Sequence, residues 1–212
     1  FVSRAGAKLN GVLDDFGISL HERVVLDVGA SAGGFTDVCL RRGASLVYAL
    51  DVGHDQLHER LRSDPRCVNM EGRNARALRA DWFPRPISFI CMDVSFISCR
   101  TLLSVIAKEL PKTEAVILIK PQFEAGREEV GKKGVVRDPK VHLEVLESFL
   151  DFVPGPGFTV MGLDYSPIKG PEGNIEYLGY LRKGTHPAPE LDPAAIVEQS
   201  HGALAHGKES GV

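Results

Sequence analysis

Short apolar runs alternate along most of the chain with longer segments in which apolar residues recur at helical spacing. The runs predict seven strands, near residues 24–28, 46–51, 67–70, 87–93, 115–119, 158–165 and 176–182. The longer segments predict helices at residues 4–16, 34–42, 54–63, 99–109 and 139–152. Strands and helices that alternate in this way predict an α/β fold, with a mostly parallel sheet and helices on both of its faces.

The last two predicted strands are joined by a short connection, Ser166 to Gly173, which is rich in proline and glycine. A parallel pair needs a longer crossover, so we expect this last strand pair to be antiparallel. The residues from 185 onward are rich in proline, alanine, histidine and glycine. We therefore expect one domain over residues 1–184 and a C-terminal tail over 185–212, with a short helix at 193–205.

A glycine-rich loop follows the first predicted strand and opens the next helix, a context in which a loop backbone can approach a nucleotide. Its pattern is D-x-G-x-x-x-G-G-F, from Asp27 to Phe35. A dinucleotide fold needs G-x-G-x-x-G, with the pyrophosphate at the helix N-terminus. The carboxylate of Asp27 instead favours a cationic ligand without phosphate, and S-adenosylmethionine carries a sulfonium and an ammonium group. The alternative is a βα turn that binds no ligand.

Charged residues stand at the ends of further predicted strands. Asp51, Asp93 and Lys120 end the second, fourth and fifth strands, and Glu176 opens the seventh. Ligands of such sheets lie beyond the carboxyl ends of the strands. Asp51 could there accept hydrogen bonds from both hydroxyls of a ribose, and a plain turn aspartate is the alternative. If their strands are adjacent, Asp93 and Lys120 project from this edge, and because a charge at the end of a buried strand needs a partner, they form either a catalytic or a purely structural pair.

The composition narrows the classes of protein. A chain of 212 residues, 43% of them hydrophobic, can bury one α/β core, and a net charge of −3 argues against tight nucleic-acid binding on its own. Neither a signal peptide nor a membrane-spanning run is visible. The four cysteines lack zinc-ligand spacing, and Cys39, Cys67 and Cys91 lie in apolar stretches typical of reduced core residues. We expect a cytoplasmic protein, and the start at Phe1 rather than methionine predicts a fragment or a processed product.

Lys8, Asp93, Lys120 and Glu176 follow the order of the K-D-K-E tetrad of FtsJ-like RNA 2′-O-methyltransferases, which the chain resembles. The local motifs are closer still to the TlyA family, whose members are named hemolysin A and ribosomal RNA cytidine 2′-O-methyltransferase. The resemblance runs from Phe1 to about Lys183, through FVSRAGAKL, LDVGASAGGFTDV, YALDVG, MDVSFIS, LIKPQFEAGREEVGKKGVVRDPKVH and SPIKGPEGNIEYL. It departs from the families at Ala32, where the FtsJ loop carries proline, and in lacking the small N-terminal S4 RNA-binding domain.

The resemblance implies a seven-stranded class I (Rossmann-like) methyltransferase sheet and methyl transfer from S-adenosylmethionine to a ribose 2′-oxygen, without a metal. Lys120 would be the general base and must be partly neutral near pH 7. Lys8 would favour its neutral form by like-charge repulsion, and Asp93 and Glu176 would orient the two lysines. The cofactor residues implied are Asp27, Gly29, Ala30, Ser31, Gly33, Gly34, Phe35, Asp51, Asn74 and Asp93. Asn74 would contact the adenine, unless it is an ordinary turn asparagine.

The implied partner is ribosomal RNA or a ribosomal subunit, contacted mainly through the S4 domain. The charged stretch from Gly126 to Lys140 predicts a mobile loop that touches RNA phosphate, or a merely solvated loop. Two other classes stay open. A membrane-active hemolysin would need a long apolar or basic amphipathic helix, and a nucleotide-dependent oxidoreductase would need G-x-G-x-x-G. Neither feature is visible in the sequence.

Overall fold

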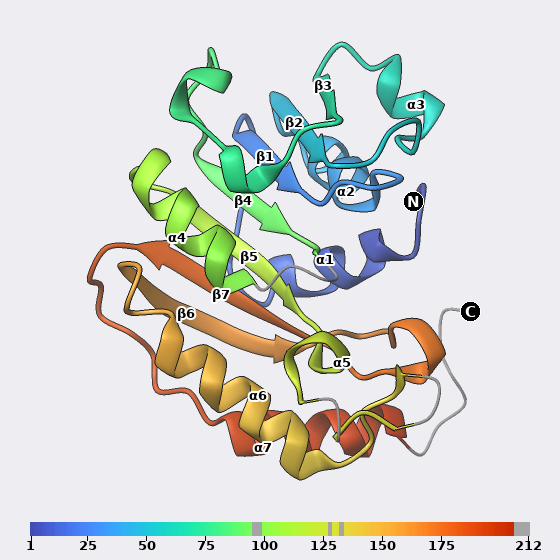
Figure 1. The fold of residues 1–212 in the computed structure, drawn as a ribbon, viewed down its shortest axis with the longest axis vertical. Coiled ribbons are helices and arrows are strands. Elements are labelled where there is room, and N and C mark those ends of the chain that lie inside the picture. The colour runs from blue at the N-terminus through green and yellow to red at the C-terminus, as the bar shows by residue number, and fades with distance from the viewer. Residues whose placement is uncertain (95–98, 127–128, 132–133, 206–212) are drawn as a thin grey trace.

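The computed structural model describes residues 1–94, 99–126, 129–131 and 134–205. Within them, seven strands form one sheet in the order β3-β2-β1-β4-β5-β7-β6 (Figure 1). The strands are β1 (Val24–Val28), β2 (Leu46–Asp51), β3 (Cys67–Glu71), β4 (Phe89–Met92), β5 (Glu114–Ile119), β6 (Phe158–Tyr165) and β7 (Tyr177–Lys183). Strands β1 to β5 run parallel, and β7 runs antiparallel to both β5 and β6. The α/β class, the seven strands and the antiparallel last pair are thus confirmed.

Helices cover both faces of the sheet, as Figure 1 shows. They are α1 (Ala5–Leu13), α2 (Gly34–Arg41), α3 (Glu59–Arg62), α4 (Cys99–Glu109), α5 (Pro121–Glu124), α6 (Pro139–Phe152) and α7 (Pro193–Ser200). One hydrophobic core joins Leu9 of α1 and Val38 of α2 to one side of the strands. The other core joins Leu103 of α4 and Leu146 of α6 to the opposite side. Strands β1, β2, β4 and β5 are therefore buried on both faces, which is why they are nearly continuous apolar runs in the sequence.

The helix predicted over residues 54–63 is wrong in length, because only α3 is helical there. Asp55 has a φ of 55°, a left-handed conformation that a helix cannot contain. His58 then starts the helix, since its Nδ1 accepts a hydrogen bond from the backbone N–H of Arg60 at 3.1 Å. The apolar spacing over 54–63 reflects Leu57 and Leu61, which are buried on either side of this cap.

Part of the predicted tail packs against the sheet. Helix α7 is followed by a π-helical turn, η6 (His201–Ala205), so the helix expected over 193–205 is present in two pieces. The hydroxyls of Ser200 and Tyr177 are hydrogen bonded at 2.8 Å, and Val197 is buried in the core that α4 and α6 share. All four cysteines are free, but Cys67 is half-buried on the edge strand β3 rather than a core residue.

Candidate active site

The glycine-rich loop leaves β1 and passes close to the end of β4. Gly29 has a φ of 80°, and a Cβ placed on it would collide with the backbone oxygen of Asp93. Only glycine therefore allows the loop to lie against the fourth strand. Gly33 has a φ of 101°, and there a Cβ would collide with Leu61 of α3. The two glycines let the chain turn sharply between β1 and α2 while the loop backbone stays at the carboxyl edge of the sheet.

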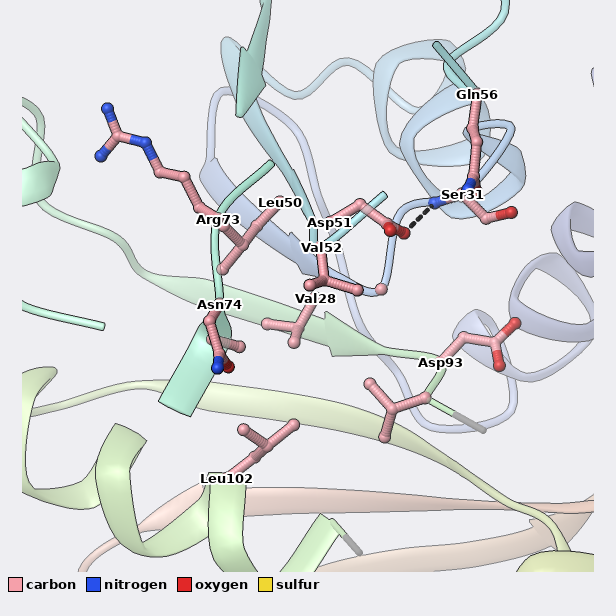
Figure 2. A pocket seen from close by; sticks show the side chains of 13 residues that line it. Val28, Ser31, Leu50, Asp51, Val52, Gln56, Arg73, Asn74, Asp93 and Leu102 are labelled. Carbon is pink, nitrogen blue, oxygen red and sulfur yellow. Dashed lines mark hydrogen bonds between the residues drawn. The ribbon is translucent and has the colours of Figure 1, made fainter. Parts of the chain in front are cut away.

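Asp51 fixes this loop from the neighbouring strand. One carboxylate oxygen, Oδ2, accepts a hydrogen bond from the backbone N–H of Ser31 at 2.7 Å (Figure 2). The other, Oδ1, accepts from the backbone N–H of Gly53 at 2.8 Å. The carboxylate thus organises the ends of both β1 and β2, and each oxygen keeps lone-pair capacity for a further donor.

A cavity of about 350 Å³ opens at this edge, between the ends of β1, β2 and β4. Its volume lies in the usual range for a small-molecule site. Figure 2 shows apolar side chains forming its walls and Asp51 and Asp93 standing at its rim. The lining residues are Val28, Gly29, Ser31, Leu50, Asp51, Val52, Gln56, Arg73, Asn74, Ala75, Asp93, Val94 and Leu102. Arg73 points away from Asp51, and its guanidinium lies over the ring of Trp82, with 5.1 Å from Cζ to the ring centroid.

Five of the ten expected cofactor residues line this cavity, namely Gly29, Ser31, Asp51, Asn74 and Asp93. The other five, Asp27, Ala30, Gly33, Gly34 and Phe35, are buried and do not line it. Sequence reasoning did not find the apolar walls or Gln56, because ordinary core and surface positions have no distinguishing pattern. Asn74 has a local task as well, since its Oδ1 accepts a hydrogen bond from the backbone N–H of Arg76 at 3.0 Å and caps the turn η1 (Ala75–Ala77).

Asp27 lies below the cavity rather than in its wall. Strand alternation turns its side chain towards α2, where Oδ2 accepts a hydrogen bond from the hydroxyl of Thr36 at 2.7 Å. Neither side chain is exposed, and Oδ1 of Asp27 has no hydrogen-bond partner among the described residues. Burial raises the pKa of this carboxyl to about 7, the hydroxyl of Thr36 opposes the rise, and the charge of Asp93 adds to it. The position suits a group that holds α2 against β1.

The four tetrad residues meet at the same edge as two ion pairs. Nζ of Lys120 pairs with Oδ1 of Asp93, which joins the ends of β5 and β4. Nζ of Lys8, on α1, lies 2.6 Å from Oε1 of Glu176. Glu176 directly precedes β7, and the pairing of Tyr177 with Ile119 places it beside Lys120. Lys8 and Glu176 are buried, whereas Lys120 and Asp93 keep 13% and 21% of their side chains exposed, so the second pair faces solvent and the cavity.

Glu176 has a second polar contact. The side-chain amide of Gln122, on α5, donates from Nε2 to Oε2 of Glu176 at 2.7 Å. Gly170 packs against the same carboxylate, and a Cβ there would collide with Oε2. The next residue on α5, Phe123, is 41% exposed, and its ring centroid lies 5.7 Å from Nζ of Lys120. Sequence reasoning missed both α5 side chains.

The stretch from Gly126 to Lys140 is only partly described. Arg127, Lys132 and Lys133, three of the basic residues expected to touch phosphate, lie outside the described residues. The described part is anchored near the tetrad, since Oδ1 of Asn174 accepts from the backbone N–H of Val136 at 3.0 Å, and Nδ2 donates to the oxygen of Gly134. Arg137 and Lys140 are exposed.

Two further observations concern membrane-spanning helices and metal-binding clusters. No helix in the described part of the chain has the length and apolar character that crossing a bilayer requires. Across residues 1–94, 99–126, 129–131 and 134–205, no group of three or more histidine, cysteine, aspartate or glutamate side chains is placed to hold a metal ion.

The seven-stranded sheet, with β7 antiparallel to its neighbours, has the Rossmann-like arrangement of class I methyltransferases, and the two lysine–carboxylate pairs lie at its carboxyl edge near the cavity. The FtsJ-like methyltransferase family matches residues 1–183, and the chain belongs to that family.

The chain is also similar to individual proteins of known name or structure. The chain is similar to a Bacillus subtilis protein with the provisional name rRNA methyltransferase YqxC, with 45% identity covering 98% of this chain and 76% of the relative. It is 39% identical to the Mycobacterium tuberculosis 16S/23S rRNA (cytidine-2′-O)-methyltransferase TlyA, covering 98% of this chain and 77% of that one. A solved structure from Streptococcus thermophilus, provisionally named a hemolysin, is 44% identical, with a TM-score of 0.92 over 97% of this chain and 76% of that chain.

Proposed function

We propose that the chain transfers a methyl group from S-adenosylmethionine to the 2′-oxygen of a ribose, most specifically that of a cytidine in ribosomal RNA. The observation that carries this proposal is the position of the Lys120–Asp93 pair, because Asp93 both lines the cavity and binds the amine of Lys120. A base is thereby held at the rim of a nucleoside-sized cavity. The rRNA and cytidine parts of the proposal rest on the names of the relatives.

The cavity fits S-adenosylmethionine in its chemistry. Val28, Leu50 and Leu102 form apolar walls for a purine ring, and the carboxylates of Asp51 and Asp93 face a ligand that carries positive charge. The guanidinium of Arg73 is stacked on Trp82, so it does not present a phosphate-binding fork at the centre of the site. Asp51 is proposed to accept hydrogen bonds from the ribose hydroxyls with the lone pairs that Ser31 and Gly53 leave free.

Bound S-adenosylmethionine supplies a methyl group on a positively charged sulfur. The chain must hold the ribose hydroxyl in line with that methyl group and remove its proton, since a neutral hydroxyl is a weak nucleophile. Nζ of Lys120 takes this proton as the oxygen–carbon bond forms and the carbon–sulfur bond breaks. Asp93 keeps Nζ at the rim of the cavity, and Glu176, which the sheet register places beside Lys120, binds the amine of Lys8.

Lys120 variants test the proposal. Lys120→Ala should reduce single-turnover methyl transfer to ribosomal RNA by about 10²-fold or more, the usual scale of acid–base catalysis. Lys120→Arg should fail as well, because a guanidinium stays protonated. Both should bind S-adenosylhomocysteine with nearly the wild-type affinity. Lys108→Arg, on the exposed side of α4, is the matched control. An arginine variant at position 120 with substantial activity would exclude the general-base role.

The partner is proposed to be ribosomal RNA or a ribosomal subunit, in the compartment where ribosomes are assembled. The chain covers 76% of the YqxC length, and an S4 domain in the remaining part of such a protein would supply RNA affinity. Among the described residues, Arg4, Arg137 and Lys140 are exposed basic side chains that could contribute to RNA binding. This partner assignment is independent of the chemistry at Lys120.

A further inference from the structure

Gln122 connects the two ion pairs of the tetrad. It lies two residues after Lys120, in the first turn of α5, and its Nε2 donates to Oε2 of Glu176 at 2.7 Å. Glu176 holds Lys8 with its other oxygen, Oε1, at 2.6 Å. Within the described residues, no direct hydrogen bond or ion pair joins the Lys120–Asp93 pair to the Lys8–Glu176 pair. The amide of Gln122 is thus the polar link between the backbone that carries Lys120 and the carboxylate that carries Lys8.

The chemistry of the contact fixes the orientation of the amide. An ionised carboxylate only accepts hydrogen bonds, so the nitrogen of Gln122, not its oxygen, must face Glu176. The carboxylate has little freedom to move away, because it is fully buried and Gly170 packs directly against Oε2. A buried carboxylate oxygen without a hydrogen-bond donor would destabilise the folded chain, and Gln122 supplies that donor.

We propose that Gln122 is a positioning residue of the methyl-transfer reaction, which fixes the Lys8–Glu176 pair relative to Lys120 through its hydrogen bond to Glu176. The inference rests on the proposed function. Gln122 does not exchange a proton with substrate in this role. Its loss would leave both ion pairs formed but would let α5 and the start of β7 shift against each other, and a displacement of about 1 Å in a catalytic group can cost about 10²-fold in rate.

Two variants of similar size separate this role from simple packing. Gln122→Met keeps the length of the side chain and removes the donor. Gln122→Glu places a second carboxyl group against Glu176, and two carboxylates in contact cannot both stay ionised. At low pH the shared proton lets the new carboxyl donate to Glu176 in place of the amide, whereas at high pH the two charges repel each other. Gln199→Met and Gln199→Glu, at an exposed position of α7, are the matched controls.

The first measurement is the single-turnover rate of methyl transfer between pH 6 and pH 9. Binding of S-adenosylhomocysteine gives the concentration of folded sites, to which each rate is normalised. We expect Gln122→Met to be slower than wild type by about 10-fold to 10²-fold with unchanged cofactor affinity. Gln122→Glu should exceed Gln122→Met several-fold at pH 6, and the advantage should disappear as the pH rises. A methionine variant within twofold of wild type, or a rate ratio of the two variants that stays constant with pH, would overturn the proposal.

The second measurement needs no catalysis. Melting temperatures of Gln122→Met, Glu176→Gln and the double variant should be strongly non-additive if the two side chains act as one unit. Additive shifts would show that the link is absent and overturn the inference. A wild-type chain that transfers no methyl group to RNA would instead remove the proposed function, and this thermal cycle would still decide whether Gln122 fixes Glu176.

Discussion

Replacing Asp27 by asparagine should change how the stability of the fold depends on pH. The carboxyl is fully buried, with one oxygen bonded to Thr36 and the other without a hydrogen-bond partner in the described part of the chain. Burial is the main cause that raises its pKa from 3.8 to about 7. The folded chain therefore keeps a proton on Asp27 at pH values where the unfolded chain has lost it.

The sign follows from the proton count. Between pH 3.8 and about 7 the folded state binds more protons than the unfolded state, so the free energy of unfolding falls as the pH rises through this interval. One pH unit corresponds to about 1.4 kcal/mol, which gives about 4 kcal/mol over the whole interval and about 3 kcal/mol between pH 5 and pH 8. Asparagine resembles the neutral carboxyl and lacks this dependence. Any unpaired amide that it introduces costs about 1–3 kcal/mol at every pH.

The assay is urea unfolding of wild type and Asp27→Asn at pH 5, 6, 7 and 8. The stability of the variant minus that of wild type should become more positive by about 3 kcal/mol between the first and the last pH. Asp15→Asn, at an exposed position, should show no comparable trend. A difference between Asp27→Asn and wild type that stays constant from pH 5 to pH 8 would refute the reasoning that Asp27 is a buried carboxyl with a raised pKa.

Three further substitutions test neighbouring parts of the account. Asp51→Ala should weaken binding of S-adenosylmethionine by about 1.5–3 kcal/mol, the range for hydrogen bonds to a charged group, and calorimetry that finds unchanged affinity would remove Asp51 from the site. Gly170→Ala should lower the free energy of unfolding by about 1–3 kcal/mol and slow methyl transfer, because the new Cβ would displace the carboxylate of Glu176. Gly202→Ala is the control for thermal melting, since a Cβ there meets no atom within 4 Å. His142→Gln should remove part of the acid sensitivity of the fold. Burial and the nearby His201 lower the pKa of His142 to about 4. The free energy of unfolding of wild type should therefore fall by up to about 3 kcal/mol as the pH falls from about 6.5 through 4. An equal fall in the variant and in wild type would contradict this.

Strands β1, β2, β4 and β5 were predictable because a buried strand leaves a nearly continuous apolar run in the sequence. The pairing of Asp93 with Lys120 followed in the same way, since both residues end neighbouring parallel strands. The helix over 54–63 was overestimated because the left-handed turn at Asp55 has no apolar signature. Spacing predicts which face of a helix is buried, but it does not report a single positive φ.

The site was harder to predict where long-range contacts decide it. Gln122 contacts a residue 54 positions away, and a glutamine in a short polar turn gives no sign of such a partner. Asp27 was expected beside the cofactor because it belongs to the glycine-rich motif. In the structure its carboxylate accepts a hydrogen bond from Thr36 of α2, and the alternation of side chains along β1 was the signal available for that orientation.

The chemical position of the transferred methyl group tests the central claim most directly. Ribosomal RNA labelled from S-adenosylmethionine with a radioactive methyl group can be hydrolysed with alkali, which requires a free 2′-oxygen to cut each linkage. Transfer to that oxygen blocks the cut. We predict that the label is found in an alkali-resistant dinucleotide with cytidine at its 5′ side. Label released in ordinary mononucleotides would place the methyl group on a base and would contradict the proposed reaction.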